Sequence, residues 1–377
     1  MKIVHIITSM NKGGAETTLF KILEYANSIK SKDKHIIITF AKFNYFETKI
    51  ENLNYEFYKI NFVNKFLFFF YFIKLINILK DIKPNVVECW MYHASFLGGL
   101  AAKLIGVKKI IWNIRHSNFK LTKTKFSTII IIKLCSYLSK IIPNKIIYCS
   151  NSSYEFHSRI GYKSSNKLLI YNGYDKKNFN NTIKKKDLKK SQVTFGFIGR
   201  YSPQKNIEMY LNALSVFIHQ YELKKNNIKV LMYGKNIDYN NKKLIHIIKK
   251  NNLSSFVELK GHVDDVAFAL EQINFLGLSS SYGESFPNIL AEAMLSGVPC
   301  FSTDVGEAKN ILSNYGKILQ VNDMCGFSKS IEEYYMLYNN KRDYLTLSEA
   351  CTKHIIDNYS IDKMYYKYQK LWIEKNE

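Results

Sequence analysis

The chain has 377 residues, 47% of them hydrophobic, which is enough to build two folded domains or one large one. Its 54 Lys and Arg outnumber 31 Asp and Glu, giving a formal net charge of +23. Because the lysines are scattered over nearly every predicted element, we attribute this charge to compositional bias together with an anionic membrane surface, and not to nucleic-acid binding.

Strands and helices alternate through the first half of the chain. Hydrophobic periodicity predicts strands at 3–8, 35–40, 54–60, 85–90, 109–114, 145–150 and 167–171, and helices at 15–29, 66–79, 96–105 and 126–141. This alternation predicts a parallel, doubly wound sheet.

A basic polar stretch interrupts the alternation, and we take its residues 184–192 as a linker. The alternation then restarts, with strands at 193–198, 228–233, 257–259, 274–278 and 300–303 and helices at 206–220, 242–251, 263–271 and after Pro287. The chain is therefore expected to form an N-terminal domain of residues 1–183, a C-terminal domain of residues 193–358, and a last helix, residues 359–377, that packs back toward the N-terminal domain.

Six cysteines without C-x-x-C spacing are expected to be buried, reduced thiols of a cytoplasmic protein. The chain enters a strand at once, so no signal peptide is expected, and no apolar run approaches the roughly 18 residues that a membrane span needs. The aromatic run Phe66–Ile73, flanked by Lys65 and Lys74, is either a core helix or a helix lying on a membrane surface.

The stretch Ser279–Gly297 has the composition of a ligand site. A strand runs into three serines, a turn follows, and Pro287 can start a helix that Gly297 ends. The free N–H groups of such a helix start suit an anion, and Glu284 and Glu292 bracket it. The pattern indicates an anion or polyol site, although the row Asn288, Glu292 and Ser296 also fits an ordinary solvated face.

Three other predicted strand ends carry ligand-like residues. Gly13 and Gly14 would let a ligand approach a helix start. Arg200 and Lys205 flank a Ser-Pro turn; they are either two more surface cations or the partners of a diphosphate. A helix start contributes only about 0.3–1 kcal/mol to anion binding, whereas charge-assisted hydrogen bonds contribute about 1.5–3 kcal/mol each. His116 follows a strand and is expected to face a cleft; no cluster has metal-ligand spacing, so no catalytic metal is expected.

Taken together, these motifs resemble the retaining glycosyltransferases of family 4. The similarity runs over nearly the whole chain and includes Gly13-Gly-Ala-Glu16, Arg200 with Lys205, Asn172-Gly-Tyr-Asp175, Glu284-Ser-Phe-Pro-Asn288 with Glu292-Ala-Met294, and Thr303-Asp-Val-Gly-Glu307. The two glutamates eight positions apart are its most specific element. Ser285 departs from the pattern, because many members have glycine after the first acid. The resemblance implies an α/β fold of the GT-B type, with two doubly wound Rossmann-like domains facing a central cleft.

The resemblance also implies roles for individual residues. The donor, a nucleotide diphosphate sugar such as a UDP-sugar, would be bound by Gly13, Gly14, Arg200, Lys205, Phe286, Pro287, Asn288, Ile289 and Glu292. Glu292 would accept hydrogen bonds from the ribose. Glu284, near the reacting carbon, and His116, beside the donor sugar or the acceptor, would be the catalytic residues. Neither a cofactor nor a metal is implied.

The function expected is a metal-independent, retaining hexosyltransferase that acts on a lipid-linked or cell-surface glycan during polysaccharide, O-antigen or capsule biosynthesis. It would work in the cytoplasm, at the anionic inner face of the plasma membrane, without a nucleic-acid partner. Two alternatives remain open at this point: a nucleotide-sugar 2-epimerase with the same fold, and a non-catalytic basic protein that binds membranes or nucleic acid.

Overall fold

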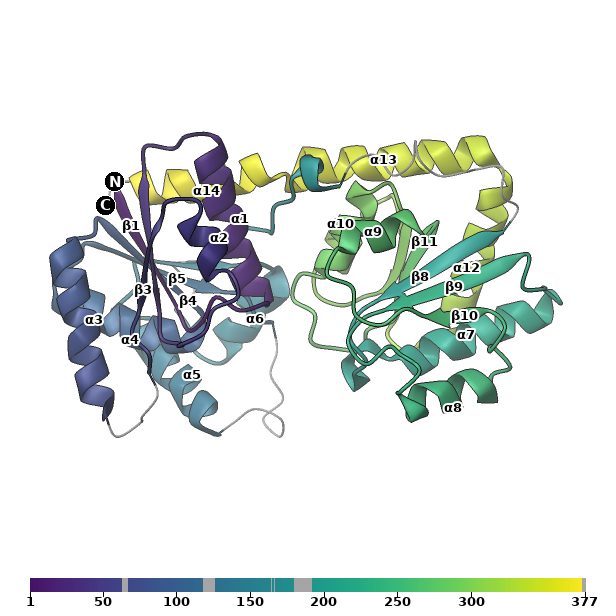
Figure 1. Cartoon of the computed structure of the whole chain (residues 1–377), viewed down its shortest axis with the longest axis horizontal. Helices are drawn as coiled ribbons and strands as arrows, with labels where there is room; N and C mark the ends of the chain where they lie inside the picture. Colours follow the sequence, from purple (N-terminus) through teal and green to yellow (C-terminus); the bar gives the residue numbers. More distant parts are fainter. Residues whose placement is uncertain (63–66, 118–125, 164, 166, 180–191, 375–377) are drawn as a thin grey trace. The chain divides into compact units, whose positions relative to one another are not determined.

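A computed structural model describes residues 1–62, 67–117, 126–163, 165, 167–179 and 192–374 (Figure 1). The chain divides into two compact units. The first unit comprises Met1–Gly173 and Ile361–Glu377, and the second comprises Tyr174–Ser360. Each unit is built around its own parallel sheet, as the alternation of strands and helices predicted.

The described strands of the first unit form a seven-stranded sheet in the order β3-β2-β1-β4-β5-β6-β7, with every neighbouring pair parallel. Parallel strands covered by helices on both faces are expected to be apolar almost throughout. In β1 only its first residue, Lys2, is exposed. The strands are β1 Lys2–Ile7, β2 Lys34–Thr39, β3 Glu56–Lys59, β4 Val86–Trp90, β5 Lys109–Ile114, β6 Lys145–Tyr148 and β7 Lys167–Leu169.

Helices cover both faces of this sheet. The side chains of α3, α4 and α5 share one core cluster with Val4 and Ile6 of β1, whereas those of α1 and α14 share another with Ile3 and Ile7. Alternate residues of a strand point to opposite faces, so these two groups of helices lie on opposite sides of the sheet. The helices of the unit are α1 Gly14–Ser28, α2 Glu47–Glu51, α3 Phe68–Ile82, α4 Met91–Leu104, α5 Phe126–Leu138, α6 Asn151–Arg159 and α14 Ile361–Ile373.

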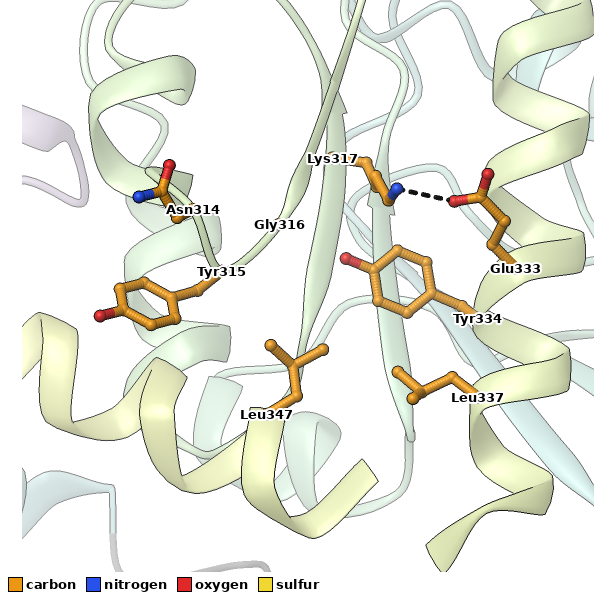
Figure 2. A pocket seen from close by; sticks show the side chains of 8 residues that line it. All are labelled: Asn314, Tyr315, Gly316, Lys317, Glu333, Tyr334, Leu337 and Leu347. Carbon is orange, nitrogen blue, oxygen red and sulfur yellow. Dashed lines mark ion pairs between the residues drawn. The ribbon is translucent and has the colours of Figure 1, made fainter. Parts of the chain in front are cut away.

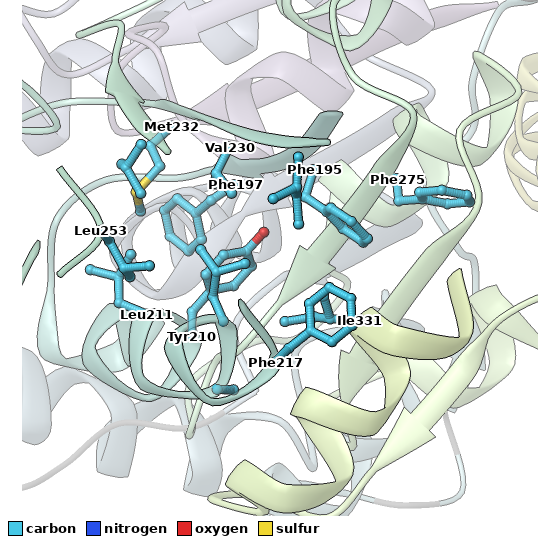
Figure 3. Packing of buried hydrophobic residues seen from close by; sticks show 14 of the residues in the cluster. Phe195, Phe197, Tyr210, Leu211, Phe217, Val230, Met232, Leu253, Phe275 and Ile331 are labelled. Carbon is cyan, nitrogen blue, oxygen red and sulfur yellow. The ribbon is translucent and has the colours of Figure 1, made fainter. Parts of the chain in front are cut away.

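The described strands of the second unit form a six-stranded parallel sheet in the order β10-β9-β8-β11-β12-β13. The strands are β8 Val193–Ile198, β9 Ile228–Tyr233, β10 Val257–Leu259, β11 Phe275–Leu278, β12 Cys300–Thr303 and β13 Lys317–Leu319. The helices are η2 Lys176–Asn178, η4 Pro203–Lys205, α7 Ile207–Gln220, α8 Lys242–Lys250, α9 Val266–Glu271, α10 Asn288–Leu295, α11 Ala308–Leu312, α12 Met324–Asn339 and α13 Lys341–Tyr359. Figure 3 shows the core between this sheet and α7 and α12, where Phe195 and Phe275 pack with Phe217 and Ile331.

Two features of the elements differ from the sequence prediction. Helix α4 begins at Met91, directly after β4, and not at Phe96. The chain makes this abrupt turn because Met91 adopts a left-handed conformation with φ of +66°, which no local glycine or proline signalled. Helices α2, α6, α11, α12 and α13 and strand β13 were not predicted, although the buried residues Phe327, Ile331, Tyr334 and Tyr338 of α12 follow helical spacing and could have indicated that helix.

The boundary between the units also differs from the prediction. The first unit was expected to reach residue 183 but ends at Gly173. The reason is that Tyr174 already bonds to the second unit: its N–H donates to the Tyr359 carbonyl at 2.9 Å and its hydroxyl to Asn288 Oδ1 at 2.6 Å. The predicted linker, residues 184–192, lies outside the described residues except for Gln192.

Helix α14 belongs to the first unit and is tied to its sheet by buried polar groups. Trp372 Nε1 donates to Glu88 at 3.0 Å, and Asn113 Nδ2 donates to the same carboxylate at 2.8 Å. The ammonium of Lys109 donates to the Leu371 carbonyl at 2.6 Å, near the end of the helix, where cations are favourable. Burial raises the pKa of Glu88 to about 7.

Five of the six cysteines are buried free thiols, as expected. Cys325 is the exception and is exposed. It lies in the first turn of α12 and not on the buried stripe formed by residues such as Phe327 and Ile331, so the helix turns its side chain outward.

Glu88→Gln is expected to change the pH dependence of stability. Because the pKa of Glu88 is raised in the folded state from 4.5 to about 7, its contribution is fully present below pH about 4.5 and is lost as pH rises through 7. The glutamine variant should therefore gain up to about 3 kcal/mol relative to the wild type between pH 5 and 8.

Thermal unfolding of both proteins across this pH range tests the prediction. Two buried histidines act with the opposite sign. His5 Nδ1 lies 3.8 Å from Glu88 Oε2, and His35 contacts His5; burial lowers the pKa of both, to about 4 for His35, so their contribution is lost as pH falls below 6.5. Both histidines are present in both proteins, so this loss at low pH occurs in both. A gap in melting temperature that stays constant with pH would contradict the assignment to Glu88.

Candidate functional site

The predicted site lies at the point where the strand order of the second unit reverses direction. From β8 the chain crosses to β9 on one side, and from β11 it crosses to β12 on the other, although β8 and β11 are neighbours. The loops that follow these two strands, residues 199–206 and 279–287, therefore leave the sheet side by side. Open parallel sheets bind their ligands at such a point, beyond the carboxyl ends of the strands.

An ion pair joins the two loops. Lys205 Nζ lies 2.6 Å from Glu284 Oε1, and the two side chains are only 14% and 12% exposed. The same carboxylate oxygen accepts from Ser280 Oγ at 2.9 Å and from Gln204 Nε2 at 3.3 Å. The backbone strengthens the connection, since Ser281 N donates to the Gln204 carbonyl at 2.8 Å. The structure thus brings together two residues that sequence reasoning had assigned to different parts of the donor.

Arg200 stands at the outer end of this network. Its side chain is exposed, and one guanidinium nitrogen donates to Gln204 Oε1 at 3.0 Å. Gln204 therefore links Arg200 to Glu284, because its amide nitrogen donates to that carboxylate. The sequence analysis missed Gln204 and Ser280, although the three-serine turn was a signal for the second of them.

Helix α10 begins and ends where the sequence predicted. Pro287 is the N-cap of the helix, and its side chain makes no capping hydrogen bond. Leu290 N donates to the Pro287 carbonyl at 3.0 Å. Gly297 follows the helix with φ of +72°, and Val298 N donates to the Ala293 carbonyl at 2.8 Å, which is a Schellman ending. The positive end of the helix dipole therefore lies next to the loop that carries Glu284, where it favours an anion.

Aromatic side chains fix the turn before α10. Phe286 is buried, with its ring centroid 6.4 Å from that of Tyr174 and 5.7 Å from that of Tyr359. Asn288 accepts the hydroxyl hydrogen of Tyr174 at 2.6 Å. Tyr174 belongs to the Asn-Gly-Tyr-Asp turn noted in the sequence, but its contact with Asn288 could not be read from it.

The polar row of α10 is not a uniformly solvated face. Glu292 is half-buried, and Ser296 is 1% exposed, with its hydroxyl donating to the Glu292 carbonyl at 2.9 Å. The interpretation of this row as a solvated face is therefore wrong for Ser296, because the helix end is covered by the protein. Ile289, also predicted to bind the donor, is half-buried in the first turn.

A tight turn after β12 supports the loop that carries Glu284. Gly306 has φ of +57°, and a Cβ there would lie 2.5 Å from the Ser285 carbonyl oxygen and 2.6 Å from that of Glu284. Glu307 N donates to the Ser285 carbonyl at 3.1 Å. Only glycine permits this close approach of two backbones.

Two predicted donor-binding glycines lie in the first unit, after β1. Gly13 is the N-cap of α1, and a Cβ there would fall 2.4 Å from a carboxylate oxygen of Glu16. Gly14 is exposed, and a Cβ there would meet no atom within 4 Å. The atoms near Gly13 are the movable end of the Glu16 side chain, so packing within the unit requires neither glycine. In the first unit the strand order reverses between the neighbouring strands β1 and β4, and both glycines follow β1.

His116 lies just beyond β5 in the same unit and is partly buried. Its carbonyl accepts from Ser153 Oγ at 2.7 Å, and its buried Nδ1 has no hydrogen-bond partner among the described residues. Burial lowers the pKa of His116, so the imidazole is neutral near pH 7 and can accept a hydrogen bond or a proton. His93 lies half-buried in α4, and burial lowers its pKa as well.

A cavity of about 250 Å³ in the second unit lies away from this site (Figure 2). It is next to the amino end of β13, where Lys317 and Glu333 form an ion pair of 2.8 Å. None of the predicted site residues lines it. The described residues also contain no group of His, Cys, Asp or Glu that could hold a metal ion.

Comparison with known proteins identifies the region that carries the site. Residues 178–346 match the family model described as "Glycosyl transferases group 1". We call these residues the group 1 domain, after the family model that they match. This domain includes Arg200, Lys205, Glu284 and Glu292, and so the whole Lys205–Glu284 network. Gly13, Gly14 and His116 lie outside the matched residues.

Two curated relatives extend beyond the group 1 domain. The UDP-Gal:alpha-D-GlcNAc-diphosphoundecaprenol alpha-1,3-galactosyltransferase of Escherichia coli is 24% identical over 80% of this chain and 78% of its own length. The capsular polysaccharide biosynthesis glycosyltransferase CapH of Staphylococcus aureus is 26% identical over 82% of this chain and 83% of its own. These relatives and the group 1 domain support glycosyltransferase activity.

Solved structures share the fold of the whole chain. HepE of Anabaena in complex with UDP has a TM-score of 0.80 at 17% identity and covers 98% of this chain and 99% of its own. A glycosyltransferase of Rickettsia africae has a TM-score of 0.81 at 16% identity, with coverage of 98% and 97%. The predicted α/β architecture of the GT-B type, with two Rossmann-like domains, is thereby confirmed.

Gly306→Ala is expected to disturb the Glu284 loop, because its Cβ would clash with the Glu284 and Ser285 carbonyls. Gly261→Ala is the matched control: Gly261 has φ of +72° in the same unit, but a Cβ there meets nothing within 4 Å. Both variants carry the backbone strain of a positive φ, of order 1–3 kcal/mol.

Thermal unfolding and UDP binding by calorimetry separate the two effects. We expect both variants to lose some stability, and Gly306→Ala alone to lose UDP affinity by about tenfold or more. Equal UDP affinities for the two variants would show that the clash does not reach the site.

Proposed function

We propose that this protein is a retaining, metal-independent hexosyltransferase of family 4 that uses a UDP-sugar as donor and needs no cofactor. The acceptor is a hydroxyl of a lipid-linked or cell-surface glycan. The observation that carries the proposal is the pairing of Lys205 with Glu284 beside the start of α10, inside the group 1 domain. It places a cation, a carboxylate and the start of a helix at one strand-end site.

The cationic side of this site suits a leaving diphosphate. Charge grows on the diphosphate as the glycosidic bond stretches, and catalysis requires donors positioned where that charge develops. Lys205 offers a point charge with three N–H donors, and Arg200 offers a planar fork for phosphate oxygens. The α10 amides add a further set of donors.

The acidic side of the site suits the sugar and the ribose. The Glu284 carboxylate, held in place by Lys205 and Ser280, can stabilise positive charge at the reacting carbon. Glu292 lies one turn into α10, so it is suited to accept hydrogen bonds from ribose hydroxyls. We assign His116 to the donor sugar or the acceptor, supported by its neutral imidazole with an unpartnered buried nitrogen.

We also propose that the enzyme works at the inner face of the plasma membrane, without binding nucleic acid. The support is indirect: the name of the Escherichia coli relative includes a diphosphoundecaprenol-linked sugar, and such an acceptor is embedded in a bilayer. The net charge of +23 favours an anionic surface.

The activity is tested by incubating the purified protein with a panel of UDP-sugars and polyprenyl-diphosphate glycans, with and without EDTA. The proposal expects UDP release, an extended glycan with the anomeric configuration of the donor, and no loss with EDTA. A donor-only arm followed by NMR detects epimerisation at C2. Conversion of the donor without acceptor, or no reaction with any pair, would refute the proposal.

Glu284→Gln and Glu292→Gln are expected to impair different properties, the first catalysis and the second nucleotide binding. The first should lower kcat about 100- to 1,000-fold, because it removes transition-state charge stabilisation, while UDP affinity changes little. The second should weaken UDP binding about 10- to 100-fold, because it removes charge-assisted hydrogen bonds to the ribose.

Steady-state kinetics and UDP calorimetry on both variants make the comparison, with the exposed Glu349→Gln on α13 as the control. The control should match the wild type in both measurements. If Glu284→Gln kept its kcat, or if both variants lost only UDP affinity, the separate roles of the two acids would be wrong.

A further inference from the structure

Helices α3, α4 and α5 lie side by side on one face of the first unit's sheet, with α4 in the middle (Figure 1). The outer side of α3 is strongly apolar at its amino end. Phe69, Phe70 and Ile73 are 76%, 62% and 55% exposed, while Leu75 and Leu79 face the core. Two exposed aromatic rings on consecutive residues are uncommon on a soluble surface, where large apolar patches mark binding sites.

Helix α5 also exposes large apolar side chains, and it does so along its whole length. Its inner side buries Ile132 and Cys135, yet its outer side exposes apolar side chains at helical spacing. These exposed side chains are Phe126, Ile130, Leu134 and Tyr137, with Ile141 just beyond the helix. A helix that is apolar on all sides is expected to be covered on all sides. Among the residues that the structure describes, none covers the outer half of α5.

The charges around these apolar side chains are almost all positive. Within the described residues 67–83, 91–108 and 126–145 there are eight lysines and a single acid, Asp81. The lysines are Lys74, Lys80, Lys83, Lys103, Lys108, Lys133, Lys140 and Lys145. We call the outward sides of α3, α4 and α5 the α3–α5 surface. It combines large apolar side chains with a strong excess of positive charge.

We propose that the α3–α5 surface docks on an anionic lipid bilayer, with its aromatic and aliphatic side chains in the headgroup boundary and its lysines on the lipid phosphates. This composition is that of helices that lie in a membrane interface. No helix in the described part of the chain is long and apolar enough to cross a bilayer, so the contact is a surface contact.

A second copy of the chain fits this surface less well than lipid does. A symmetric contact through the same patch would bring together the exposed helix lysines Lys74, Lys80, Lys103 and Lys133 of both copies, and like charges across an interface are unfavourable. Lipid phosphates neutralise them instead. The inference deepens the proposed function, because it names the surface that would bring the enzyme to a lipid-linked acceptor, but it does not depend on the donor site.

The first test is cosedimentation of the full chain with vesicles of phosphatidylcholine alone or mixed with phosphatidylglycerol, without any sugar nucleotide. We expect binding to the anionic vesicles, little binding to the neutral ones, and weakening by salt. UDP binding is measured separately, so a failure of vesicle binding and a failure of the proposed function are told apart. Absence of binding to both kinds of vesicle would overturn the inference.

Two matched quadruple variants locate the binding surface. Replacing Lys74, Lys103, Lys133 and Lys140 with Gln should weaken binding to anionic vesicles on the order of 100-fold or more. Replacing Lys242, Lys243, Lys249 and Lys250 of α8, all exposed, makes the same charge change in the second unit and should have a much smaller effect. Equal losses for the two variants would show that total charge, and not the α3–α5 surface, governs binding.

A further variant tests how much the exposed apolar side chains contribute to vesicle binding. Phe69→Ser with Tyr137→Ser removes two exposed rings and should reduce vesicle binding by about tenfold or more without lowering the melting temperature. Phe268→Ser, at a side chain 56% exposed in the second unit, is the control and should bind normally. If the double variant instead converted a dimer to a monomer in light scattering, with vesicle binding unchanged, a second copy would be the occupant.

Discussion

The order of the parallel strands in the second unit is the constraint on which its site depends. β8 and β11 are adjacent in the sheet, although β8 ends at Ile198 and β11 begins only at Phe275, 77 positions later. Their adjacency brings the Arg200–Lys205 turn next to the Ser279–Pro287 turn. The contacts that join these two turns, the Lys205–Glu284 pair and the hydrogen bond from Gln204 to Glu284, follow from this arrangement.

The Lys205–Glu284 ion pair is not explained by a contribution to the stability of the fold. In a largely buried ion pair, the desolvation of both groups offsets much of their attraction, so the net contribution to folding is small. Here the pair is supported by Ser280, by Gln204 and by the close approach of Gly306, so several residues maintain one geometry. Because several residues maintain this polar geometry at a strand end, a binding role explains it better than a structural role does.

The first unit combines an internal polar network with an unusual exterior. On one face of its sheet, α14 closes the core through Trp372 and Glu88, which gives the unit a buried carboxyl group whose pKa is raised to about 7. On the other face, α3, α4 and α5 present the α3–α5 surface. The proposed roles of the two units therefore differ: the second carries the nucleotide site, and the first carries the lipid-facing surface.

The sequence by itself determined the fold class and the kinds of residue at the site. The alternation of apolar strands with amphipathic helices predicts two parallel sheets, and Pro287 and Gly297 fixed the ends of α10, because these are local properties of the chain. Only the tertiary structure decided that Lys205 pairs with Glu284, 79 residues away, since strand order sets which loops meet. It also decided that the first unit ends at Gly173, and that α5 leaves one apolar side uncovered. Periodicity shows which residues share a face of a helix, but not what, if anything, packs against that face.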